Sequence, residues 1–236
     1  MRVLQINMKK MIGMANLKEV VMQKKYVMLL LILAFSFSCE TKRAVDTSLQ
    51  GKNIKTEIPL TKKGQPDFFY RLSKYQASKL QLDSLEIGYD SLQIRIWYNY
   101  GLLDIQNVAI IKRNNGQWKA ELLTLNFDEN DSSLMRMPIL KERINKVPAS
   151  GWTFFLKGLV ELNIMGLPDQ RKVSGYKEML GADGVSYNVE VATKEEYRFF
   201  SYWQPDIYKK ESKEAMNMEL TLEFLEKELS FKRLKR

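Results

Sequence analysis

The sequence predicts an α+β fold: an antiparallel β-sheet built from hairpins, with two main helices packed on one face of it. Two stretches, 92–100 and 185–191, alternate their side chains at the period of a half-buried strand. The residues Asn115-Gly116 divide two apolar runs, which is typical of a hairpin. Two further stretches, 152–163 and 215–229, repeat their apolar residues at helical spacing. Strands joined by hairpins, with helices kept apart from them, are typical of the α+β class.

The first half of the domain is predicted to be mainly strand. Residues 68–72 are compatible with either a first strand or a helical turn. The turn at 113–116 joins strands predicted at 108–112 and 117–127, because asparagine and glycine tolerate positive φ. The segment 138–148, which has a proline at each end, shows no clear period and has no assignment.

The second half is predicted to begin and end with a helix. Ser150 is the expected N-cap of the first of these helices, and 166–169 is its expected end. A helix of about twenty residues, with its apolar face over 215–229, is the last element. Pro205 ends the strand before it. The strands expected between the two helices are 176–180, 185–191 and 197–203.

The chain is predicted to carry one globular domain, residues 67–236, behind a signal peptide at 1–38 and a flexible tether at 39–66. Hydrophobic residues make up 45% of the chain and charged residues 28%, a composition that supports a real core. The predicted tether is polar and lacks a sustained period. The net charge of +9 comes from residues 1–38 and from the last five residues, so the body of the domain is near neutral. We therefore expect no nucleic-acid partner.

A short apolar stretch near the N-terminus predicts that the protein is exported. Two lysines precede the apolar run 26–37. This run is shorter than the about 20 residues that span a bilayer, but it suits the apolar region of a signal peptide. Ser38 and Cys39 follow it directly, and Cys39 is the only cysteine of the chain. Met22 is a plausible true start of translation, and the rival starts are Met8, Met11 and Met14.

This arrangement resembles a bacterial lipoprotein signal, in which the peptidase cuts before an invariant cysteine that becomes acylated. The resemblance covers about residues 22–40, and Ser38 supplies the small residue that precedes the cysteine. Ser36 departs from the pattern, because leucine is usual at that position. The resemblance implies lipidation at Cys39, with a lipid anchor in the cell outer membrane and the domain facing the periplasm. The alternative is ordinary secretion, which leaves Cys39 as a free thiol at the mature N-terminus. Downstream, the domain resembles uncharacterised bacterial lipoproteins, which implies no activity.

The composition argues against most catalytic chemistry. The chain has no histidine, which is the commonest general acid or base and the commonest metal ligand. A single cysteine allows neither an intramolecular disulfide nor a cysteine-rich zinc site. The sequence contains no phosphate-binding glycine loop, nucleotide fingerprint or metal motif. We therefore expect no cofactor, no metal and no catalytic residue.

The best candidates for a contact surface lie on two aromatic strands. Alternation gives the strand 197–203 two aromatic faces. In the strand 92–100, it places Arg95 and Trp97 on the face opposite the one that carries the isoleucines. An exposed aromatic side chain beside an arginine would suit a sugar ring or a peptide. The alternative is that a helix or loop covers these faces. The candidate contact residues are Arg95, Trp97, Arg198, Tyr202 and Trp203.

Carboxylates are the remaining groups for acid–base chemistry. Asp169 follows a proline and Asp183 precedes a glycine, so both are expected in ordinary turns. Glu190 lies between two valines and is expected to face solvent from its strand. A glycosidase needs two carboxylates that face each other across a cleft, and the spacing of these residues does not establish such a pair.

These observations predict a lipid-anchored cell-envelope protein that acts as a non-catalytic binding or structural module. Its partners would be the membrane, through the lipid, and an envelope protein or glycan. One alternative is a carboxylate-dependent hydrolase of envelope glycans. A second alternative is an anchored immunity or inhibitor protein.

Overall fold

The computed structural model describes residues 54–234, apart from 102, 129, 132, 175 and 177–183. The described residues belong to one compact unit, Ser48–Arg236. The predicted signal peptide, Cys39 and most of the predicted tether lie outside the described residues. The same holds for Asp183 and for nearly all of the strand and turn predicted over 176–183.

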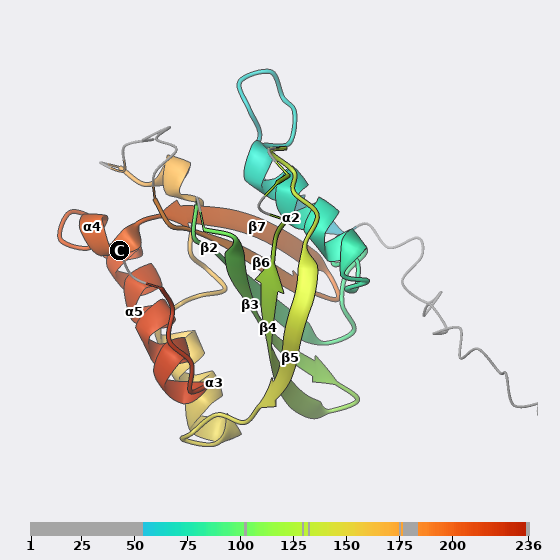
Figure 1. Ribbon diagram of the computed structural model, residues 1–236. Helices are drawn as coiled ribbons and strands as arrows, with labels where there is room; N and C mark the ends of the chain where they lie inside the picture. The colour runs from blue at the N-terminus through green and yellow to red at the C-terminus, as the bar shows by residue number, and fades with distance from the viewer. Residues whose placement is uncertain are drawn as a thin grey trace, which may run out of the picture. The chain divides into compact units, whose positions relative to one another are not determined.

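A seven-stranded sheet lies at the centre of the described fold, and the predicted α+β class is confirmed (Figure 1). The strands lie in the order β1-β7-β6-β2-β3-β4-β5. All neighbours are antiparallel except β1 and β7, which are parallel. In chain order the strands are β1 (Lys55–Glu57), β2 (Leu92–Asn99), β3 (Ile105–Asn114), β4 (Gln117–Asn126), β5 (Ile139–Lys146), β6 (Ser186–Thr193) and β7 (Glu196–Trp203).

Helices cover both faces of this sheet, whereas the sequence led us to expect them on one face. α2 (Phe68–Lys79) packs on one face, and α3 (Trp152–Glu161) and α5 (Lys213–Glu228) pack on the other (Figure 1). In β2, Ile96 and Trp97 point to opposite faces and both are fully buried. A strand that is buried on both faces needs cover on both sides. The shorter elements are the 3₁₀ turn η2 (Gln170–Lys172) and α4 (Pro205–Tyr208).

The two faces of the sheet differ in chemistry. The face under α3 and α5 carries the large apolar core, which includes Ile94, Phe200 and Leu222. The face under α2 carries two smaller apolar clusters, and buried polar residues of β2 and β6 share that face. α2 begins after Asp67, whose side chain accepts a hydrogen bond of 2.8 Å from the N–H of Tyr70.

The predicted hairpin at Asn115-Gly116 is confirmed. The two residues have φ angles of 50° and 76°, and they join β3 to β4. The strands predicted at 92–100, 185–191 and 197–203 correspond to β2, β6 and β7. Residues 68–72, which the sequence left open between strand and helix, belong to α2.

Three details differ from the prediction. The segment left without assignment contains β5, an edge strand that is exposed on most positions and therefore has no apolar alternation. The N-cap of α3 is Gly151 rather than Ser150. The hydroxyl of Ser150 instead donates a hydrogen bond of 2.8 Å to Glu228, and α3 ends at Glu161.

Candidate functional site

A cavity of about 470 Å³ lies between α2 and one end of the sheet. Its described lining comes from α2, from β2, β3 and β7, from the start of β6, and from the loops that follow β2 and β4. Small-molecule sites in proteins have volumes of about 300–1,000 Å³. The size of the cavity therefore suits a small ligand.

One row of cross-strand neighbours forms the floor of the cavity. Gln106 of β3 lies opposite Asn99 of β2. On the other side, Asn99 lies opposite Ser186 of β6, which lies opposite Trp203 of β7. Residues directly opposite one another share a face of the sheet. The floor is therefore an uncharged polar strip with an indole at one end.

α2 forms the roof with Phe68, Phe69, Leu72 and Gln76. Gln76 is 3% exposed, and its Oε1 has no hydrogen-bond partner among the described residues. A buried polar atom without a partner costs about 1–3 kcal/mol. Gln76 is thus the polar residue that α2 contributes to the roof, and its Oε1 is buried rather than open to the cavity.

The rim of the cavity combines an exposed apolar side chain with two charged ones. Leu134 lines the cavity and is 82% exposed. Arg136 forms an ion pair with Asp104, and its guanidinium lies 4.9 Å from the ring centroid of Phe127. Asp131 is the only carboxylate among the described lining residues.

Two glycines allow the loops at the cavity to approach closely. A Cβ at Gly184 would lie 2.2 Å from Nε1 of Trp203. A Cβ at Gly101, where φ is +69°, would lie 2.5 Å from the carbonyl oxygen of Gly184. The indole of Trp203 therefore occupies a position that a side chain at residue 184 would block.

The predicted contact residues Arg95 and Trp97 do not form an exposed surface. Both are fully buried on the face of the sheet that α2 covers. This agrees with the alternative in the sequence analysis, that a helix or loop covers these residues. Each donates to Oε1 of Glu190, Arg95 through Nη1 at 3.1 Å and Trp97 through Nε1 at 2.8 Å.

The expectation that Glu190 faces solvent is wrong. Its side chain is fully buried, and its Oε2 accepts a hydrogen bond of 3.0 Å from the hydroxyl of Tyr197. Burial, followed by the nearby charge of Glu190, raises the pKa of Tyr197 well above its usual range. This Glu190 cluster (Arg95, Trp97, Glu190 and Tyr197) stabilises the fold rather than offering a contact surface.

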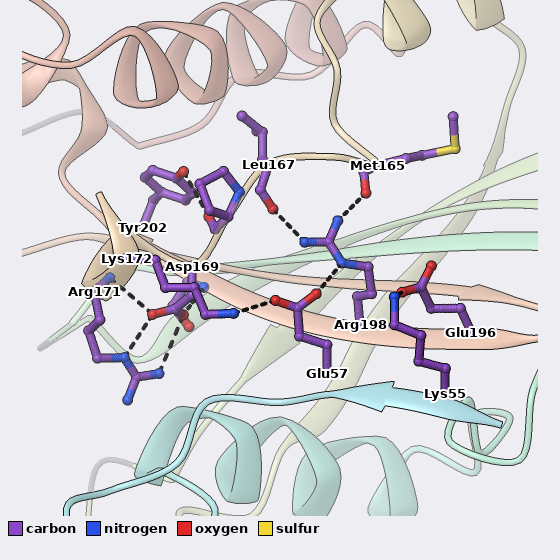
Figure 2. A network of polar contacts seen from close by, with 12 residues as sticks. Lys55, Glu57, Met165, Leu167, Asp169, Arg171, Lys172, Glu196, Arg198 and Tyr202 are labelled. Atoms are coloured by element: carbon purple, nitrogen blue, oxygen red, sulfur yellow. Dashed lines mark hydrogen bonds and ion pairs between the residues drawn. The ribbon is translucent and has the colours of Figure 1, made fainter. Parts of the chain in front are cut away.

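Arg198 and Tyr202 hold the segment between α3 and η2 against β7, as Figure 2 shows. Arg198 donates to the carbonyl oxygens of Met165 and Leu167. The fully buried Tyr202 donates to the carbonyl oxygen of Pro168 at 2.8 Å. Both side chains are engaged within the protein, so neither forms the predicted contact surface.

Glu57 of β1 completes this network, because it pairs with Lys172 and with Arg198 (Figure 2). The hydrogen bonds from Lys172 and from Arg198 lower the pKa of Glu57 from 4.5 to about 2. Three residues of β1 pair with β7. Ion pairs between side chains therefore reinforce a short backbone ladder.

Asp169 also has a structural role. Its Oδ1 accepts from the backbone N–H of Arg171, which caps η2, and its Oδ2 accepts from the N–H of Ser201 at 3.1 Å. The neighbouring Gln170 accepts from the N–H of Trp203 at 2.6 Å. Side-chain oxygens thus accept hydrogen bonds from the backbone N–H groups of β7 that lie beyond its pairing with β1.

The basic C-terminal segment contains a buried ion pair that no local sequence pattern indicates. Arg233 is 2% exposed and pairs with Glu219 and Glu226 of α5. The last five residues contribute to the net charge of the chain, but they are not all exposed to solvent. Arg233 instead packs the chain after α5 onto that helix.

Two general features apply to the part of the chain that the structure describes. No group of three or more acidic, histidine or cysteine side chains there could hold a metal ion. No helix there is long and apolar enough to cross a membrane.

Of the five predicted contact residues, only Trp203 lies at the cavity. Gln76, Asn99, Gln106 and Ser186 were missed. Polar residues on a strand ordinarily indicate a solvent face, and only the identification of α2 as a helix could have indicated that this face is covered.

Comparisons of the chain with protein-family models, with curated proteins and with solved structures found no match. The cavity and its residues therefore carry the functional argument.

Proposed function

We propose that this chain is a lipid-anchored protein of the bacterial cell envelope that binds a small ligand, without catalysis, in the cavity beneath α2. The observation that carries the proposal is the cavity itself. It combines a volume of about 470 Å³ with a floor of uncharged polar side chains and with Gln76, whose buried Oε1 has no hydrogen-bond partner among the described residues. Concave sites with apolar walls and a few convergent polar groups are typical of ligand pockets.

The lining supports binding more than hydrolysis. A glycosidase uses two carboxylates across a cleft, and the described lining contributes only that of Asp131. The chain also has no histidine to serve as a general base. A binding protein needs only the shape and the polar contacts.

Ligand-observed NMR with a small-fragment library tests the binding proposal. The wild-type chain should bind fragments that compete with one another for one site. The variant Ser186→Trp, which fills the floor of the cavity, should lose those fragments. Ser91→Trp, at a site away from this cavity, is the matched control and should keep them. Equal binding to all three proteins would place the fragments elsewhere and count against the proposal.

The lipid anchor at Cys39 is supported by the two lysines, the apolar run and Ser38 that precede it. Metabolic labelling with a fatty-acid analogue tests it. The wild-type protein should take up the label and Cys39→Ala should not. Label retained in the variant would contradict acylation at this residue.

The proposed place is the outer membrane, with the domain facing the periplasm. Protease added to intact cells should leave the protein whole, and the same protease should digest it after the outer membrane is opened. Digestion in intact cells would instead indicate a domain on the cell surface.

A further inference from the structure

The polar floor of the cavity continues beneath α2 as a second row. Asn188 follows Ser186 by two residues along β6, so the two side chains share a face. Ser201 of β7 lies directly opposite Asn188. Both residues are buried, and neither Asn188 Oδ1 nor Ser201 Oγ has a hydrogen-bond partner among the described residues. The same applies to Oε1 of Gln76 in the roof.

Unpaired buried polar atoms are rare in native proteins, and ordered water or a ligand commonly satisfies them. Gln76 already lines the cavity. A torsional change that turns its amide toward a bound hydroxyl breaks no hydrogen bond at Oε1, because that atom has none among the described residues. Ordered water below the floor can serve the deeper pair, Asn188 and Ser201.

The charges at the cavity argue against an ionised ligand. Arg136 is already paired with Asp104, and Asp131 accepts a hydrogen bond of 2.9 Å from the N–H of Ser133 near the rim. An ionised carboxylate or phosphate group can only accept hydrogen bonds, so such a group cannot satisfy Oε1 of Gln76. A cation bound at the floor, away from Asp131 near the rim, would leave its charge unpaired beside neutral amides, which is costly.

Hydroxyl groups suit this lining because each of them both donates and accepts. The floor offers the amides of Asn99 and Gln106, which also carry both functions. Trp203, at one end of the floor, and Phe127 add aromatic surface to the lining. A sugar ring combines a hydroxylated edge with a C–H face that packs on such aromatic side chains.

We propose that the cavity binds an uncharged saccharide, with its hydroxyl groups bonded to Gln76 and to the floor amides and its ring packed on Trp203. This inference rests on the proposed function, because it names the ligand class of the same cavity.

The test uses the full chain with Cys39→Ser, which prevents acylation at that residue. Calorimetric titration is carried out with a panel of neutral mono- to tetrasaccharides, with glucuronic acid, and with decanol. At least one neutral saccharide should bind, whereas glucuronic acid and decanol should not. Gln76→Leu should weaken saccharide binding by about 3- to 10-fold, the effect of losing one neutral hydrogen bond.

Trp203→Ala should weaken saccharide binding by about 10-fold or more. Gln93→Leu is the matched control, because Gln93 is a buried glutamine on the α2 side of β2 that does not line the cavity. This control should bind like the parent, and thermal unfolding shows that each variant is folded. Saccharide binding that is unchanged in both cavity variants would overturn the inference.

The outcomes distinguish a failure of the saccharide proposal from a failure of the ligand-binding function on which it rests. Suppose that decanol binds to the parent but not to Trp203→Ala, and that no saccharide binds. The proposal of a saccharide ligand is then refuted, but the cavity remains a ligand site. If no probe binds and the fragment test also fails, both the saccharide and the ligand-binding function are refuted.

Discussion

Replacing Glu190 by alanine tests whether the buried carboxylate is the organising group of the α2 side of the sheet. The substitution removes the acceptor of three hydrogen bonds, from Arg95, Trp97 and Tyr197. It leaves the guanidinium of Arg95, whose side chain is fully buried, without its ion-pair partner. The carbonyl oxygen of Asp83, 3.2 Å from Nη2, remains as an acceptor for Arg95.

The expected loss of stability follows from that uncompensated charge. Breaking a buried ion pair by removing one partner costs about 3–5 kcal/mol. For a domain of this size, 1 kcal/mol lowers the melting temperature by about 2–4 °C. Glu190→Ala should therefore melt about 6–20 °C below the wild type.

Thermal unfolding followed by circular dichroism is the assay, and Glu195→Ala is the matched control. Glu195 is an exposed glutamate in the turn that follows β6, so its replacement should change stability by less than about 0.5 kcal/mol. The double variant Arg95→Leu with Glu190→Leu should recover much of the loss, because apolar side chains of similar volume can replace a buried pair.

Two results would refute this reasoning. A melting temperature of Glu190→Ala equal to that of Glu195→Ala would show that the carboxylate is not essential. A double variant that is as unstable as the single one would show that the loss does not come from an unpaired Arg95.

Three other predictions follow from contacts described above. Glu57→Gln should destabilise the protein above pH 4.5, and the difference in stability from wild type should shrink as the pH falls toward 2. The reason is that the pKa of Glu57 is about 2 in the folded protein, whereas its ordinary value is 4.5. Urea titrations at several pH values measure this difference, and a difference that does not change with pH would contradict the prediction. Arg233→Ala should cost about 3–5 kcal/mol because Glu219 stays buried without its partner, whereas the exposed control Lys232→Ala should be neutral in the same titrations. Gly184→Ala should displace the indole of Trp203 and change the near-ultraviolet circular dichroism, and an unaltered spectrum would refute the close contact.

Much of the sheet could be predicted because its signals are local. The alternation in β2 and β6 and the Asn-Gly turn between β3 and β4 each depend on residues close together in sequence. β5 could not be predicted, because an edge strand exposed on both faces has no apolar period. The stretch at 68–72 is compatible with both helix and strand, because five residues are too few to distinguish the two.

The site could not be predicted, because it depends on what covers the sheet. Trp203 was singled out as an aromatic residue on a two-faced strand, and it does line the cavity. Glu190 was expected in solvent because its strand alternates polar and apolar residues. Alternation shows which residues share a face, but it does not show whether a helix far away in sequence lies over that face.

The unequal faces of the sheet also bear on how the molecule opens. α5 packs on a broad apolar core, whereas α2 packs on small apolar clusters beside buried polar groups, some of which lack partners among the described residues. Amide hydrogen exchange should accordingly be faster in α2 than in α5, since segments with less buried apolar surface open at lower free energy. A ligand that bridges α2 and the floor would slow exchange in α2 first. Ligand affinity and the rate of hydrogen exchange in α2 would then both depend on the same equilibrium, the separation of α2 from the sheet.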